Sequence, residues 1–241
     1  MTKFNETRWS EGEYSGKYID AADIIVIERR RMIEIVKSFY RHNILGRRER
    51  SLLDLGCGDG ILTRELLTID SSLSATLIDG SEEMLEKARV RMKGCSDITL
   101  VKASFQELLS GEKTIPTSLS FVVSSLAIHH LPMEEKRGLF KLIHTHLEEG
   151  GSFLNIDTTL SPTERLEEWY VALWREWIDG QKERLGAEGN YDEFLSKYKE
   201  ESHYRNLDTL QDQLAALKEA GFRDVDCYYK YGMVAIYGGI R

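Results

Sequence analysis

Residues 51–66, SLLDLGCGDGILTREL, hold three glycines within five positions, between an apolar run and an amphipathic run. Leu52, Leu53 and Leu55 suit a short buried strand, and the apolar residues after the glycines recur at helical spacing. The stretch therefore predicts a strand, a glycine turn and a helix. Because glycine has no Cβ and the first turn of a helix has free N–H groups, the turn is a candidate ligand cradle, with a plain tight turn as the alternative.

The composition indicates a globular chain with a buried core. Its 241 residues are 41% hydrophobic, which is enough for one domain. A net charge of -8 disfavours a surface that neutralises many phosphates, so a nucleic-acid partner is not expected. The three cysteines lie far apart without metal-ligand spacing, so we expect reduced thiols, a cytoplasmic location and no metal site. No signal peptide or apolar run of membrane-spanning length is apparent, and no membrane association is expected.

Apolar runs and periodic stretches alternate along most of the chain. This alternation is typical of a parallel sheet with helices on both faces. A helix over 207–219 precedes two strands, RDVDCYYK and GMVAIYGG, whose short connection requires them to be antiparallel. The other expected strands are 51–55, 74–79, 97–102, 119–125 and 151–157, and the helices expected among them are 60–68, 81–92 and 134–147.

Two segments lie outside this alternation within the single domain expected over 1–241. Residues 1–48 form an N-terminal segment with an amphipathic helix expected over 20–43. Residues 158–206 form an insertion that is rich in aromatic side chains. It follows the C-terminal end of a strand, which is the end at which open α/β folds bind ligands. The insertion is expected to be helical, and both a lid over the site and a packed helical hairpin remain open.

Two acids suggest what the glycine turn binds. Asp54 stands two residues before the first glycine, which suits a cationic ligand group better than a pyrophosphate. Ile61 replaces the last glycine of the dinucleotide fingerprint, which disfavours a nicotinamide cofactor. Asp79 ends the next apolar run, where a carboxylate can accept hydrogen bonds from both hydroxyls of a ribose. A helix N-terminal acid is the alternative for Asp79.

Five motifs in register resemble those of the class I S-adenosylmethionine (SAM) dependent methyltransferases. The resemblance covers residues from about 50 to 241 and implies SAM as cofactor and S-adenosylhomocysteine as product. It also implies a doubly wound α/β fold, whose seven-stranded sheet has the order 3-2-1-4-5-7-6 with strand seven antiparallel. The motifs are LLDLGCGDG (52–60), LIDGSEEMLEKA (77–88), FVVSSLAIHHL (121–131), HLEEGGSFLNID (146–157) and LKEAGFRDVDCYYKYGMVAIYGG (217–239).

The resemblance implies a set of cofactor-binding residues. Asp54 would interact with the amino group of SAM, and Asp79 would hold the ribose. After strand three the family usually places an acid for the adenine amino group, but this chain has Ala103 and Ser104, so that contact stays open. The implied residues are Asp54, Gly56, Cys57, Gly58, Asp79, Gly80, Met84, Ser104, Phe105 and Ser124.

Other residues are candidates for catalysis and for binding the acceptor. His129 and His130 follow the fourth strand, and either could act as a base because histidine titrates near neutral pH. A histidine pair that only caps the loop is the alternative. Tyr14 and Tyr18 are expected in an N-terminal segment that folds over SAM. The candidates for acceptor binding, all in the insertion, are Trp174, Tyr204 and Arg205.

The leading functional hypothesis is a SAM-dependent methyltransferase that acts on a small molecule. One alternative is an RNA-modification enzyme, acting directly or through a modified SAM as the carboxy-SAM synthases do. Another is a regulator that binds SAM without catalysis, which the intact first motif disfavours. The loop SSLAIHH (124–130) has neither the Pro-Pro-aromatic nor the Pro-Cys motif of DNA methyltransferases. The oligomeric state stays open, a homodimer included.

Overall fold

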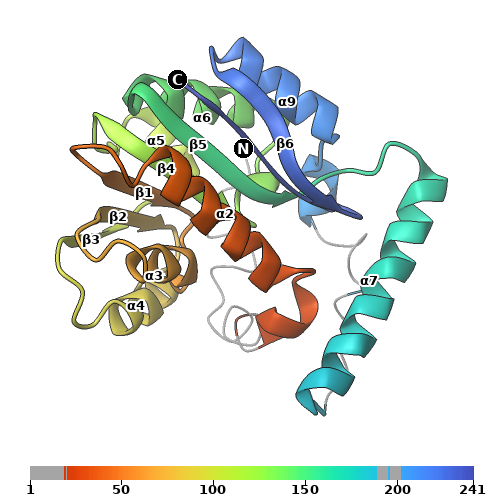
Figure 1. Cartoon of the computed structure of the whole chain (residues 1–241). Coiled ribbons are helices and arrows are strands. Elements are labelled where there is room, and N and C mark those ends of the chain that lie inside the picture. Colours follow the sequence, from red (N-terminus) through yellow and green to blue (C-terminus); the bar gives the residue numbers. More distant parts are fainter. Residues whose placement is uncertain (1–18, 20, 189–194, 196–201) are drawn as a thin grey trace.

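In a computed structural model of the chain, the strands of the described residues join one seven-stranded sheet (Figure 1). The structure describes residues 19, 21–188, 195 and 202–241. The strand order is β3-β2-β1-β4-β5-β7-β6, and β7 runs antiparallel to both of its neighbours, so the predicted topology is confirmed. The strands are β1 (Ser51–Leu55), β2 (Ser74–Asp79), β3 (Ile98–Lys102), β4 (Leu119–Ser125), β5 (Leu147–Thr158), β6 (Arg223–Tyr231) and β7 (Val234–Ile240).

Helices cover both faces of the sheet (Figure 1). One apolar core includes side chains of α2, α3 and α4, and the other includes side chains of α5, α6 and α9. The helices are α2 (Arg29–Asn43), α3 (Ile61–Leu67), α4 (Glu82–Arg91), α5 (Phe105–Ser110), α6 (Met133–His146), α7 (Glu164–Leu185) and α9 (Leu210–Glu219), with short 3-10 helices η3 (Ile128–His130) and η4 (Ser202–Asn206).

The first strand shows why the sheet is buried on both faces. Leu52 points into the core beneath α2 and α3, whereas Leu53 and Leu55 point into the core beneath α6 and α9. Successive side chains of a strand alternate between faces, so a continuous apolar run suits a strand covered on both sides. Each fully buried leucine contributes about 1.5–3 kcal/mol to folding.

The strand order also determines where a ligand can bind. The chain moves from β1 to β2 on one side and later returns to place β4 on the other side of β1. The connections after β1 and β4 therefore leave in opposite directions, which opens a crevice at the carboxyl ends of these strands. The glycine turn and the loop with the two histidines both begin at this edge of the sheet.

Helix α5 and strand β5 differ from the sequence-based prediction. Helix α5 was not predicted; its N-cap is Ser104, which forms a reciprocal capping box with Glu107. Strand β5 starts at Leu147 rather than at residue 151, because Leu147 pairs with Leu119 across a register shift. Leu147 therefore belongs to the strand and not to the preceding helix, which ends at His146.

The N-terminal helix predicted over 20–43 is interrupted. Residues 21–25 are helical, a turn follows in which Glu28 has a positive φ of 52°, and α2 then begins at Arg29. The indole N–H groups of Trp174 and Trp177 on α7 donate to the carbonyls of Ile25 and Ile24, at 2.7 and 2.9 Å. The insertion thus holds the N-terminal segment through its backbone.

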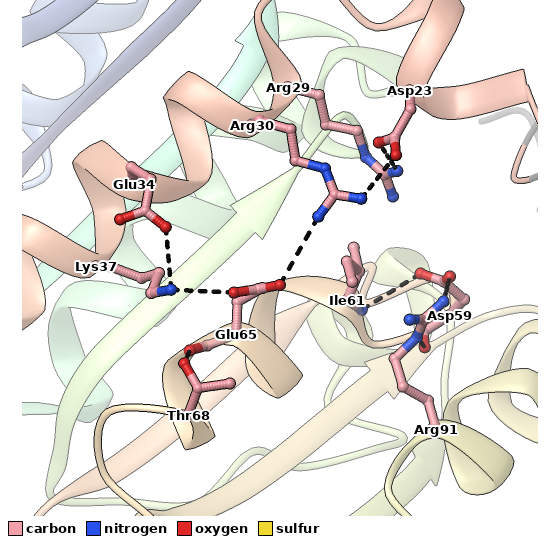
Figure 2. Close-up of polar contacts among 10 residues, drawn as sticks. All are labelled: Asp23, Arg29, Arg30, Glu34, Lys37, Asp59, Ile61, Glu65, Thr68 and Arg91. Carbon is pink, nitrogen blue, oxygen red and sulfur yellow. Dashed lines mark hydrogen bonds and ion pairs between the residues drawn. The ribbon is translucent and has the colours of Figure 1, made fainter. Parts of the chain in front are cut away.

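Ion pairs connect the N-terminal segment to the helix that follows the glycine turn (Figure 2). The carboxylate of Asp23 pairs with Arg29 at 2.6 Å and with Arg30 at 2.7 Å. Glu65 on α3 in turn pairs with Arg30 at 3.8 Å and with Lys37 at 3.1 Å. These contacts place residues 21–37 against the helix that follows the glycine turn.

Several predictions about these two segments have no test in the structure. Tyr14 and Tyr18 lie outside the described residues. α7 accounts for much of the insertion and stands beyond the edge of the sheet (Figure 1), but most of 189–201 also lies outside the described residues. The domain boundaries at 1–48 and 158–206, and the choice between a lid and a hairpin, stay predictions.

Candidate functional site

The glycine turn after β1 has the backbone that its sequence predicts. The backbone φ angles of Gly56, Gly58 and Gly60 are positive, at 64°, 54° and 75°. Residues with a side chain rarely adopt such angles. A Cβ at Gly56 would lie 2.4 Å from the Cβ of Ala127, so the turn packs closely on the loop after β4. A Cβ at Gly58 would meet no described atom within 4 Å. The turn is therefore closed at its first glycine and open at its second.

Asp79, at the end of β2, is bound to this turn. Its Oδ2 accepts a hydrogen bond from the backbone N–H of Gly58 at 2.9 Å, and its Oδ1 accepts one from that of Ser81 at 2.8 Å. Burial raises the pKa of Asp79, although these bonds oppose the rise. Each carboxylate oxygen has a second lone pair, so the predicted bonds to two ribose hydroxyls are compatible with these contacts. Ser81, rather than Asp79, caps α4.

Asp54 is on β1, two residues before the first glycine of the turn, and is 1% exposed. Its Oδ2 accepts a hydrogen bond from the hydroxyl of Thr63 at 2.6 Å. Burial raises the pKa of Asp54 to about 7, and the nearby charges of Asp79 and Asp59 add to the rise. A cationic ligand would offset these acids, which fits the sulfonium and ammonium groups of SAM. The predicted contact of Asp54 itself with the SAM amino group stays a prediction.

The hydroxyl groups of the two predicted cofactor-binding serines form hydrogen bonds within the protein. The hydroxyl of Ser124 is buried and donates to the carbonyl of Leu55 at 2.7 Å, which joins β4 to the end of β1. The hydroxyl of Ser104 donates to the Glu107 carboxylate at 2.8 Å and accepts the Glu107 N–H. Both hydroxyls therefore stabilise the fold, and any cofactor contact they make would use a remaining lone pair.

The other predicted cofactor residues surround the same turn. The ring of Phe105 lies beside it, because its Cζ would be 3.5 Å from a Cβ at Gly56. Cys57 and Met84 are buried, at 7% and 3% exposure, and burial raises the pKa of the Cys57 thiol well above its usual range. Gly80 is partly exposed. Their contacts with a cofactor stay predictions.

His129 has an acidic partner that the sequence analysis missed. Its Nδ1 lies 2.5 Å from Oδ1 of Asp157, and the two residues are 6% and 0% exposed. β4 and β5 are parallel neighbours with Ser125 beside Ile156, so the loop after β4 meets the end of β5. The signal was present in the sequence: Asp157 is the last residue of a quoted motif and ends a strand at the edge where the candidate site lies.

His130 differs from His129 in its surroundings. The two imidazole rings lie side by side, with centroids 4.1 Å apart. The backbone carbonyl of His130 accepts a hydrogen bond from the side chain of Asn206 at 2.8 Å. Because the carboxylate of Asp157 is hydrogen-bonded to His129, His129 is a stronger candidate for a base than His130.

The predicted acceptor residues divide into two groups. Tyr204 and Arg205 belong to η4, which Asn206 joins to the histidine loop. The hydroxyl of Tyr204 donates to the carboxylate of Glu167 at 2.7 Å, and burial together with that charge raises its pKa to about 12. The Arg205 side chain is exposed. The indole N–H of Trp174 is instead bonded to the N-terminal segment.

The described part of the chain has neither a candidate membrane span nor a candidate metal site. No helix there combines the length and the apolar character needed to cross a bilayer. No group of three His, Cys, Asp or Glu side chains there could hold a metal ion. The cytoplasmic location remains a prediction.

Sequence comparison gives one family match and related curated proteins. Residues 52–151 match the model of a methyltransferase domain. A carboxy-S-adenosyl-L-methionine synthase of Nautilia profundicola is 23% identical over 209 residues, which cover 85% of this chain and 80% of that protein. A carboxy-S-adenosyl-L-methionine synthase of Methylococcus capsulatus is 28% identical over 196 residues, which cover 77% of this chain and 76% of that protein.

Structure comparison places the chain among methyltransferase folds. An O-methyltransferase family protein from Burkholderia thailandensis has a TM-score of 0.65 and 15% identity, with 100% of this chain and 65% of that one covered. An O-methyltransferase family 2 protein from Planctomyces limnophilus, solved with apigenin, has a TM-score of 0.63 and 15% identity, with 97% and 61% covered. This chain thus spans less than two thirds of the length of these two structures, and the likeness shows the fold.

Proposed function

Residues 52–151 belong to the class I SAM-dependent methyltransferases, and from this premise we propose that the chain methylates a small-molecule acceptor with His129 as the general base. The observation that carries the proposal is the 2.5 Å contact between His129 and Asp157 at the sheet edge where the glycine turn lies. A buried carboxylate that accepts from Nδ1 leaves the basic lone pair of the imidazole on Nε2. The residues at the turn fit SAM because the acids there favour a cation and because Gly58 is open.

The residues of this chain would orient the reactants and take one proton. When bound, SAM supplies an electrophilic methyl group on a sulfonium. Asp79 would hold the ribose, and Gly58 would admit the backbone close to the cofactor. Such positioning can lower a barrier by ~7–11 kcal/mol. His129 would accept the proton that the acceptor loses as it gains the methyl group, which is worth roughly 10²- to 10⁴-fold in rate.

The acceptor class follows from the need for a base. An acceptor hydroxyl, or an amine that is protonated at neutral pH, must lose a proton during transfer. A neutral amine or a carboxylate has no such need before it attacks. A small molecule that carries a hydroxyl or ammonium group is therefore the acceptor that the His129–Asp157 pair supports.

A second candidate function is the synthesis of a carboxylated SAM. It is favoured by the two relatives with that name, whose similarity extends over more than three quarters of this chain and of each relative. The glycine turn and Asp79 would bind SAM in the same way in both functions. The two candidates therefore differ in the product and not in the cofactor site.

The test follows the fate of SAM by mass spectrometry. We expect the wild-type protein, given SAM and a panel of small alcohols, phenols and amines, to release S-adenosylhomocysteine with at least one acceptor. We expect His129→Ala to lower this turnover by roughly 10²-fold while calorimetry shows unchanged SAM affinity. Full turnover in His129→Ala would remove the base assignment. A carboxylated nucleoside on the purified protein, with no S-adenosylhomocysteine formed, would favour the second candidate.

A further inference from the structure

The carboxylate of Asp157 is embedded in a polar network inside the sheet. It is 0% exposed, and three N–H groups donate to it. Nδ1 of His129 and the backbone N–H of Thr158 lie 2.5 and 3.0 Å from Oδ1, and Nδ2 of Asn155 lies 3.1 Å from Oδ2. Hydrogen bonds from these N–H groups compensate the carboxylate for the water that it loses on burial.

The amide of Asn155 connects this carboxylate to the next strand. Asn155 and Asp157 are two residues apart on β5, so their side chains share one face of the sheet. Nδ2 of Asn155 also donates to the hydroxyl of Tyr237 at 2.8 Å, and these residues are directly opposite each other in the β5–β7 pair. The two protons of the amide are thus directed to Asp157 and Tyr237. A flipped amide would point its oxygen at the carboxylate, which is repulsive.

The network lies where the fold itself would favour apolar residues. Asn155 and Tyr237 are both 0% exposed, and they share the core face of β5 and β7 with Phe153 and Ala235. Burial, together with the charge of Asp157, raises the pKa of Tyr237 well above its usual range, so its phenol stays neutral. Replacing such buried polar groups by well-packed apolar ones is often neutral or stabilising. Stability is therefore not a sufficient reason for the network, whose other end is His129.

We propose that Asn155, supported by Tyr237, is a positioning residue for His129. By holding Oδ2 of Asp157, the amide directs Oδ1 at Nδ1 of His129. The imidazole is then kept in one tautomer and one ring orientation, with its proton on Nδ1 and its lone pair on Nε2. This inference rests on the proposed function for the role of His129 as base, but the tautomer is a property of the protein without substrate.

The test reads the tautomer directly. Side-chain 1H–15N correlation spectra at a fixed pH should show wild-type His129 as the Nδ1–H tautomer alone. Asn155→Leu has a similar volume and no donor, and it should give a mixture of tautomers and lower kcat about tenfold or more, as part of the base's contribution is lost. SAM affinity should not change. Tyr237→Phe, which keeps the ring, should shift the tautomer ratio in the same direction but less.

Ser120→Ala is the matched control. Ser120 is also buried and polar, and it bonds to Ser51 at the start of β1, the end of the sheet remote from the site. This variant should lose a comparable buried hydrogen bond and leave both the tautomer and kcat unchanged.

The outcomes separate the two proposals. A pure Nδ1–H tautomer in both Asn155→Leu and Tyr237→Phe would overturn the positioning role. Tyr237→Phe alone decides this point if Asn155→Leu does not fold. A shifted tautomer, combined with full turnover of His129→Ala, would support the positioning role and overturn the base assignment.

Discussion

The backbone N–H of Gly58 donates to Oδ2 of Asp79 at 2.9 Å, so the turn after β1 and the acid that ends β2 form one unit. The acid that is expected to bind the ribose also determines the shape of the turn. A change at either residue should therefore affect both the cofactor and the turn, and the next two predictions separate these effects.

Replacing Asp79 by alanine should weaken the binding of SAM and of S-adenosylhomocysteine. Hydrogen bonds to a charged group contribute ~1.5–3 kcal/mol, so calorimetry should show a loss in affinity of about that size. Glu83→Ala is a suitable control, because Glu83 is an exposed acid on the neighbouring α4 that pairs with Lys87. Equal affinities for wild type and Asp79→Ala would remove Asp79 from the ribose site.

Gly58→Val should abolish SAM binding and leave the protein folded. The valine would occupy the open side of the turn, and its left-handed φ should cost ~1–2 kcal/mol of stability. Gly111→Val provides the control, because Gly111 also has a positive φ and open space around it but caps α5. Both variants should lose similar stability in urea titrations, and only Gly58→Val should lose binding. Retained binding in Gly58→Val would mean that the turn is not the cradle.

The buried carboxyl of Asp54 should make stability depend on pH. Its pKa is about 7 in the folded protein and ~3.9 when unfolded. The folded state therefore holds a proton that the unfolded state releases between these values, and the stability from this proton is lost as pH rises from about 4 to about 7. Each unit of pKa shift corresponds to about 1.4 kcal/mol.

Urea unfolding at pH 5 and pH 8 checks this prediction. Asp54→Asn cannot titrate, so it should gain stability relative to wild type at the higher pH. In Asp70→Asn the difference from wild type should be similar at both pH values. Although burial tends to raise the pKa of Asp70, its bonds to Arg50, Tyr40 and Ser72 outweigh this and lower it to about 2. A difference for Asp54→Asn that does not change with pH would contradict the raised pKa.

Tyr204→Ala and Arg205→Ala should each lower turnover far more than SAM affinity. Tyr204 lies on η4, which Asn206 joins to the histidine loop, and its hydroxyl is hydrogen-bonded to Glu167; Arg205 is exposed next to it. The paired measurement is SAM affinity by calorimetry and S-adenosylhomocysteine release across small alcohols, phenols and amines. Lost affinity in both variants would assign these residues to the cofactor site. No change in either quantity would make η4 purely structural.

The local elements and the backbone of the glycine turn could be predicted from the sequence. Residues 51–66 determine their own strand, turn and helix, because the apolar period, the glycines and the first helical turn are properties of neighbouring positions. The position of Asp79 at the C-terminal end of its strand follows in the same way, because Asp79 ends an apolar run. The order of the strands could be predicted from the resemblance of five motifs to those of the methyltransferases.

Only the tertiary structure decided which side chains meet. His129 and Asp157 are 28 positions apart, and the parallel register of β4 and β5 brings them together. Trp174, predicted at the acceptor, reaches back 149 positions to the carbonyl of Ile25. A local pattern specifies the face on which a side chain lies but not what lies across from it, because that partner depends on how distant segments pack.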